Sequence, residues 1–133
     1  MKVIIAFCLI GFVAAQSGGW SPVSVNNPEV VKAASTAINY HNQNSDNPNY
    51  KKLVSIKSAE SQVVSGTNYA LKLNILETEC PKDDVNSIKC SPSSKSIPEE
   101  CDYVVYVPLN SNKGEVTSNS CSSNHSYESS QSQ

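Results

Sequence analysis

The chain has 133 residues, 17% of them charged and 38% hydrophobic, and this length suits one globular domain. Its formal net charge of -2 comes from 10 basic and 12 acidic residues, and all of the basic residues are lysine. The protein therefore lacks both the basic field and the guanidinium groups that recognise phosphates and bases, and we expect no nucleic-acid partner.

The first fifteen residues have the pattern of a secretory signal peptide. A lysine follows Met1, residues 3–13 form an almost unbroken apolar run, and Ala14-Ala15 offers small side chains for cleavage before Gln16. The run is shorter than the roughly 20 apolar residues that span a bilayer, and no later stretch approaches that length. We expect residues 1–15 to be removed, which leaves a secreted, extracellular protein without a membrane anchor.

A leader and then a helix follow the cleavage site. Residues 16–27 are rich in glycine, serine and proline, and we expect them to be extended and mobile at their start. Asn27-Pro28-Glu29 carries the features of a helix start: a capping side chain, a proline in the first turn, and an acid near the positive end of the helix dipole. Apolar residues at spacings of three and four predict a helix from Pro28 to about Asn42. Its apolar face holds Val30, Ala33, Ala34, Ala37, Ile38 and, at the end, His41.

Two strand patterns come next, joined by a turn signal. Residues 51–62 mix aliphatic with polar side chains, and residues 68–79 alternate apolar and polar side chains as a half-buried strand does. Ser65-Gly66 lies between them, and its glycine supplies a backbone conformation that other residues resist. We therefore predict an antiparallel hairpin, followed by a surface excursion over the proline- and serine-rich residues 80–101.

A second hairpin and a tail complete the chain. Residues 103–107 read YVVYV, residues 108–114 carry turn-forming residues, and residues 115–121 can return as a fourth strand. Residues 122–133 offer too little apolar surface to pack, so we expect a disordered, serine-rich tail. The tail contains an N-glycosylation sequon at Asn124.

The cysteines predict two disulfides. Cys8 leaves with the signal peptide, and an even number remains in a chain destined for an oxidising compartment. The remaining residues are Cys80, Cys90, Cys101 and Cys121. Three connectivities are open, and pairing of neighbours would close two small loops. The cysteine spacings contain no CxxC pair of the kind common in zinc sites, and both histidines lie far away in sequence, so we expect no metal and no cofactor.

The residues offer no catalytic set. No GxSxG, HExxH or P-loop motif is present, and His41 is the only histidine before the tail. Paired cysteines would leave no free thiol as a nucleophile, so we expect a protein that is not an enzyme. His41 is expected to end the inner face of the helix, and Trp20 to pack against the sheet or the helix.

Several motifs occur in an order that resembles a known family. Gly18-Gly19 stands near the expected mature N-terminus, residues 62–66 read QVVSG and match QxVxG, and Pro108-Leu109 precedes the last cysteine. With the signal peptide, the capped helix and the four late cysteines, they resemble the secreted, disulfide-bonded (type 2) cystatins. The resemblance covers roughly residues 18–121.

This resemblance implies an α+β architecture, the cystatin fold. One long α-helix would pack on a twisted antiparallel β-sheet of four to five strands, within a domain over residues 16–121. The implied disulfides are Cys80 with Cys90 and Cys101 with Cys121. The implied function is reversible, tight-binding inhibition of papain-like cysteine peptidases of the cathepsin L or B kind. A monomer is expected, and a domain-swapped dimer through the first hairpin is left open.

In cystatins a three-part wedge enters the peptidase cleft: the N-terminal trunk around a glycine, the first hairpin and the second hairpin. The matching residues here are Gly18, with Gly19 as the alternative register, then Gln62, Val63, Val64, Ser65 and Gly66, and finally Pro108 and Leu109. Physical reasons support these residue types. A tight hairpin with apolar side chains fills a groove without presenting a peptide bond for attack, and a glycine lets the trunk bend away from the nucleophile.

Two departures from the family pattern keep an alternative function open. Leu109 stands where the family normally has tryptophan, and only Gln16-Ser17 would precede Gly18 after cleavage. Both changes predict weaker contact with a peptidase. The alternative is a cystatin-fold secreted binding protein that has lost inhibition, and the intact QVVSG sequence favours the inhibitor. Asn44-Ser45-Asp46 departs from the Ser-Asn-Asp order of cystatins that block asparaginyl endopeptidases, so we assign no residue to that role.

Overall fold

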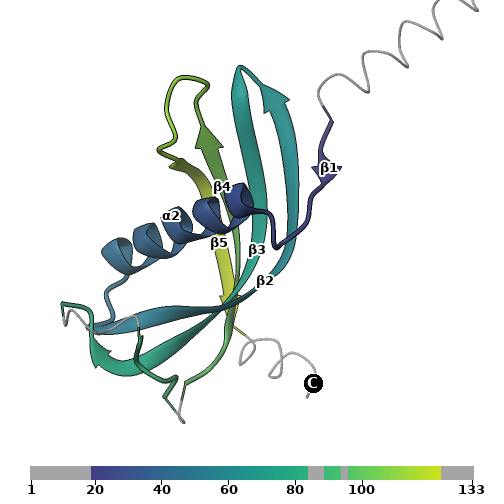
Figure 1. The fold of residues 1–133 in the computed structure, drawn as a ribbon. Helices are drawn as coiled ribbons and strands as arrows, with labels where there is room; N and C mark the ends of the chain where they lie inside the picture. The colour runs from purple at the N-terminus through teal and green to yellow at the C-terminus, as the bar shows by residue number, and fades with distance from the viewer. Residues whose placement is uncertain (1–18, 84–88, 94–95, 124–133) are drawn as a thin grey trace, which may run out of the picture.

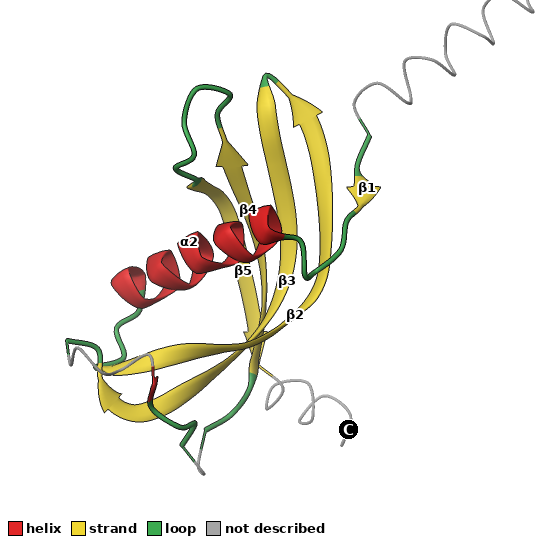
Figure 2. Ribbon diagram, in the orientation of Figure 1, coloured by secondary structure: helices red, strands yellow, loops and turns green. Residues whose placement is uncertain are grey.

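A computed structural model describes residues 19–83, 89–93 and 96–123, in which one helix lies across one antiparallel sheet (Figure 1). The strand order is β1-β2-β3-β4-β5, so each strand pairs with its neighbours in the chain. The elements are β1 (Ser21–Pro22), α2 (Pro28–Asn44), β2 (Asn49–Val64), β3 (Gly66–Pro81), β4 (Glu99–Val107) and β5 (Glu115–Ser123). Figure 2 shows the helix crossing one face of the twisted sheet. The predicted fold is confirmed, with five strands.

The helix begins as the sequence predicts. The side-chain oxygen of Asn27 accepts a hydrogen bond of 2.8 Å from the backbone N–H of Glu29, and Pro28 occupies the first turn. The helix ends at Asn44, two residues beyond the predicted end. Within the part of the chain that the structure describes, no helix is long and apolar enough to cross a membrane.

The helix is joined to the sheet by Asn42, a role that the sequence does not signal. Asn42 is buried, and its amide donates to the carbonyl oxygens of Ile38 and Lys51 at 3.1 and 2.9 Å. Its side-chain oxygen accepts from the backbone N–H of Lys51 at 2.8 Å. All the polar groups of this buried amide are therefore used, and they fix the end of α2 against the start of β2.

Replacing Asn27 with alanine should destabilise the fold by about 1 kcal/mol, because the backbone N–H of Glu29 at the start of the helix loses its capping partner. Urea unfolding followed by circular dichroism measures this change. Asn26→Ala is the matched control, because Asn26 is exposed and lies just before the capping position. An equal loss for both variants would show that the cap does not stabilise α2.

The core lies between the helix and the concave face of the sheet. The apolar face of α2 packs against alternate residues of β3 and β4, as the alternation in residues 68–79 predicts. The buried residues of this core are Val30, Ala33, Ala34, Ala37, Ile38, Ala59, Leu71, Leu73, Ile75, Cys101, Tyr103 and Val105. Three alanines on the helix leave room for the sheet to approach closely.

Trp20 does not pack as expected. It is 40% exposed and lies outside the core. Trp20 is followed by β1, a short strand that no pattern in residues 16–27 predicts. Ser21 pairs with Ser61 of β2, so Trp20 directly precedes the edge strand of the sheet.

Both predicted hairpins and both implied disulfides are present. Ser65 alone joins β2 to β3, and residues 108–114 join β4 to β5. Cys101 and Cys121 are directly opposite each other on β4 and β5, and their disulfide links these two strands. The other disulfide, Cys80–Cys90, ties the end of β3 to the excursion. The strand β5 extends to Ser123, two residues into the expected tail, and residues 124–133 lie outside the described residues.

Candidate functional site

The two hairpin ends lie side by side at one end of the sheet, uppermost in Figure 1. They adjoin because Thr67, next to the first turn, pairs with Val107, the last residue of β4. Pro108-Leu109 follows Val107 directly and is therefore held beside the first turn. The strand β1 runs antiparallel to β2, so the residues before Ser21, Gly19 included, are directed toward the same end. Gly18 lies outside the described residues.

Three aliphatic side chains project from this end into solvent. Val63 is 74% exposed, Val64 is 46% exposed, and Leu109 is 78% exposed. None of them contributes to the core, so folding alone does not explain their hydrophobicity. Neighbouring apolar groups that stay exposed are typical of a surface that binds a partner.

The remaining residues of the hairpin hold its shape. Gln62 is half-buried, and its side-chain oxygen accepts a 3.1 Å hydrogen bond from Asn68 across the ladder. Ser65 is exposed at the turn, and the phenol of Tyr106 donates a hydrogen bond to its carbonyl oxygen. Gly66 has φ +119°, which explains the glycine predicted there. Nothing in the YVVYV pattern signals the contact of Tyr106, because strand propensity does not tell which residue reaches a neighbouring turn.

A second group of polar side chains lies at the far end of the helix. The Nδ1 atom of His41 is 2.8 Å from the hydroxyl of Tyr103, and its Nε2 atom is 3.4 Å from a carboxylate oxygen of Glu99. Lys51 pairs with the same carboxylate at 3.0 Å. These residues line a cavity of about 310 Å³ beside Cys121. His41 thus ends the inner face of α2, as the sequence analysis expects, and also ties the helix to β4.

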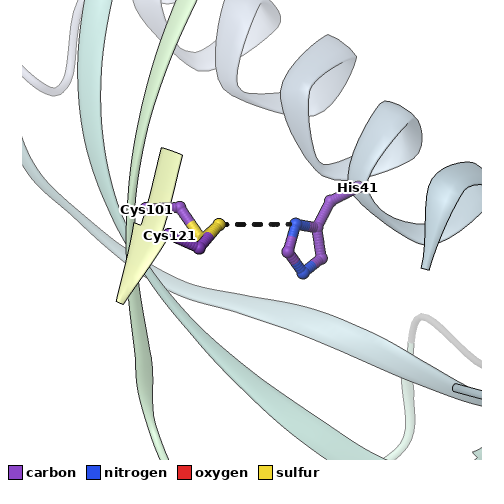
Figure 3. A group of neighbouring side chains, drawn as sticks. All are labelled: His41, Cys101 and Cys121. Carbon is purple, nitrogen blue, oxygen red and sulfur yellow. Dashed lines mark hydrogen bonds between the residues drawn. A yellow bond between two sulfur atoms is a disulfide. The ribbon is translucent and has the colours of Figure 1, made fainter. Parts of the chain in front are cut away.

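His41 approaches a disulfide, a contact that no local sequence pattern signals. Figure 3 shows the imidazole facing Cys101 and Cys121, with Nδ1 of His41 4.0 Å from the sulfur of Cys121. The three potential ligand atoms lie within 4.8 Å of one another. The sulfurs are bonded to each other, however, and zinc binds cysteine as a thiolate. Sequence separation therefore does not keep His41 from the two cysteines. The disulfide is what makes their sulfurs unsuitable as zinc ligands.

Two members of this group, Glu99 and Tyr103, have shifted pKa values. The adjacent imidazole of His41, with the ammonium group of Lys51, lowers the pKa of Glu99 to about 2, although partial burial opposes the shift. Burial raises the pKa of Tyr103 to about 12, with smaller contributions from Tyr40 and Glu99. Glu99 therefore stays ionised and Tyr103 neutral over the whole physiological range.

Acid should destabilise the protein through Glu99. Its pKa is lower in the folded chain than in the unfolded chain, so its stabilising contribution is present above about pH 4.5 and is lost as the pH falls toward 2. For this partly exposed group we expect a loss of about 2 kcal/mol. Urea unfolding at several pH values tests this, with Glu99→Gln as the comparison. The variant should lose less stability on acidification than the parent protein, and equal losses would contradict the assignment.

Comparison with known proteins identifies the family. The cystatin domain matches residues 18–110. A cystatin of Pseudonaja textilis is 30% identical over 129 residues, which cover 91% of this chain and 92% of that protein. Cystatin-1 of Crotalus adamanteus is 44% identical over 73 residues, which are 55% of this chain and 52% of that protein, so this match spans about half of that relative.

Solved structures share the fold. The crystal structure of Al-CPI matches with a TM-score of 0.72 and 31% identity over 80% of this chain and 99% of that chain. A salivary cystatin of the soft tick Ornithodoros moubata matches with a TM-score of 0.64 and 27% identity, over 79% of this chain and 97% of that chain. Dimeric human cystatin F, 23% identical, has the same fold with a TM-score of 0.72, over 82% of this chain and 90% of that chain.

The chain belongs to the cystatin family, and its two disulfides agree with a type 2 cystatin. Cystatins are, as a family, inhibitors of cysteine peptidases rather than enzymes. The family and the disulfides also agree with a secreted protein.

Proposed function

We propose that the protein is a secreted, reversible, tight-binding inhibitor of papain-like cysteine peptidases of the cathepsin L or B kind. In this proposal three segments form one contact edge: Gly18-Gly19, residues 62–66 and Pro108-Leu109. The observation that carries it is the group of exposed aliphatic side chains, Val63, Val64 and Leu109, at neighbouring hairpin ends. Residues 1–15 would serve as the signal peptide, residues 16–121 as the inhibitory domain and residues 122–133 as a disordered tail.

The shape of the hairpin supports inhibition without cleavage. A papain-like cleft is a groove lined by apolar and backbone groups, with a thiolate held beside a histidine. A substrate must lie extended in this groove to bring a carbonyl group near the thiolate. Here both strands stay paired up to Val64 and Gly66, so the turn at Ser65 cannot extend without breaking the ladder. The hairpin can fill the groove while its peptide bonds stay out of attack geometry.

Docking would be driven by the exposed aliphatic groups. Their burial is worth about 25 cal/mol per Å² of apolar surface removed from water. The turn is already folded in the free protein, so little conformational entropy is lost on binding. Leu109 fills less space than the tryptophan typical of the family, so the second hairpin contributes less than the first.

Titration of active-site-counted papain with the refolded mature protein tests the proposal. We expect residual hydrolysis to fall at near-stoichiometric or submicromolar protein. Full activity at tens of micromolar protein would refute inhibition and favour the alternative, a cystatin-fold binding protein. The smaller Leu109 and the two-residue trunk before Gly18 are the features that favour this alternative. We expect a monomer, which size-exclusion chromatography checks.

A further inference from the structure

The turn of the first hairpin is contacted by a residue of the second hairpin. The phenol of Tyr106, on β4, donates a hydrogen bond to the carbonyl oxygen of Ser65. Ser65 is the single residue that joins β2 to β3, since Val64 and Gly66 form the last pair of the ladder. The bond therefore reaches the outermost peptide group of the proposed contact edge.

The side chain of Tyr106 is packed against this turn as well as bonded to it. A Cβ atom placed on Gly66 would lie 2.8 Å from the hydroxyl oxygen and 2.9 Å from Cε1 of Tyr106. It would also lie 2.6 Å from the carbonyl oxygen of Val107. Contacts this short are repulsive, so only glycine leaves room for the ring beside the turn. Gly66 is thus required by its positive φ and, independently, by the neighbouring strand.

We infer that Tyr106 is a positioning residue that holds the one-residue turn against β4 and presets the contact edge. Its link to inhibition rests on the proposed function, whereas the restraint on the turn is a property of the free protein. Without the bond, the Ser65 carbonyl group turns to water and the turn samples more conformations. Only a fraction of the molecules then has the turn in the conformation that docks, and the apparent affinity is reduced in proportion to that fraction.

Tyr106 also couples the two hairpins. It lies two residues before Pro108-Leu109 and bonds to the turn at Ser65, so one side chain fixes the spacing between both parts of the edge. The backbone pairing of Thr67 with Val107 supplies the second link. A docking surface made of two loops needs this spacing to be fixed before binding, because ordering the loops on the peptidase would cost affinity.

Tyr106→Phe tests the inference, because it removes the hydroxyl group and keeps the ring. In the free variant we expect amide hydrogen exchange at Gly66 and Thr67 to be about fivefold faster, with the exchange of Leu73 in the core and the melting temperature unchanged. Association with papain, measured by stopped flow, should slow by a similar factor. Tyr50→Phe is the matched control, since Tyr50 is a half-buried tyrosine at the far end of β2.

Equal exchange at the turn in Tyr106→Phe and in the parent protein would overturn the inference. Faster exchange throughout the core would also overturn it, because that pattern indicates general destabilisation. Faster exchange at the turn with unchanged papain association would refute the link to docking. If the parent protein itself does not inhibit papain, the proposed function fails, and the exchange comparison alone decides whether Tyr106 holds the turn.

Discussion

Replacing Val64 with aspartate is expected to weaken papain inhibition by about 100-fold or more. In the proposed complex, the side chain of Val64 is buried in the largely apolar cleft of the peptidase. A carboxylate there loses its water without gaining a counter-charge. In the free protein Val64 is 46% exposed, so the substitution should leave the melting temperature nearly unchanged. The inhibition constant from papain titration and a thermal unfolding curve measure the two effects.

Val54→Asp is the control for this experiment. Val54 lies on the same strand, β2, and is 51% exposed, so the same substitution changes charge and strand propensity equally. Ten residues of strand separate it from Val64, a distance of about 30 Å. We expect Val54→Asp to inhibit like the parent protein. If Val64→Asp also inhibits like the parent, the first hairpin is not the contact surface.

Removing the disulfide between Cys101 and Cys121 should destabilise the protein by about 3 kcal/mol, a large part of the stability of a domain of this size. The bond closes a loop with a sequence separation of 20, and Cys101 is fully buried in the core. Urea unfolding of the double alanine variant measures the loss. Inhibition should persist under conditions in which the variant is folded. Cys101 lies six residues before Val107 on β4, which places the disulfide about 20 Å from the hairpin ends.

The second disulfide supplies the comparison. Cys80–Cys90 closes a loop with a sequence separation of only 10, and both of its cysteines lie outside the buried core. Its removal should therefore cost less than removal of Cys101–Cys121. A larger loss for the Cys80–Cys90 pair would contradict this ranking and would indicate that the excursion contributes more to stability than its burial suggests.

The main elements were predictable because their signals are local. The cap at Asn27, the apolar face of α2 and the alternation in residues 68–79 each follow from a short stretch of chain, and each is observed. The disulfide pairing was different, because the residues left three connectivities open and only the resemblance to cystatins chose between them. The single glycine at the first turn was predictable from its conformation, and the observed φ of Gly66 explains it.

The features that sequence reasoning missed depend on contacts between distant segments. The pairing of β1 with β2 depends on where a two-residue strand meets a sheet edge, which no periodicity encodes. The group around His41 joins α2 to β4 and to the Cys101–Cys121 disulfide, residues 60 to 80 positions apart. The bond from Tyr106 to Ser65 joins positions 41 apart. Such contacts become visible only when the fold brings the segments together.

A crystal structure of this protein bound to papain tests the central claim most directly. We predict that Val63, Val64 and Leu109 lie in the active-site cleft, that the turn at Ser65 faces the catalytic thiol, and that its peptide bonds are intact. Contact through the outer face of α2 or through the free edge of β5, with the hairpin ends left in solvent, would contradict the account.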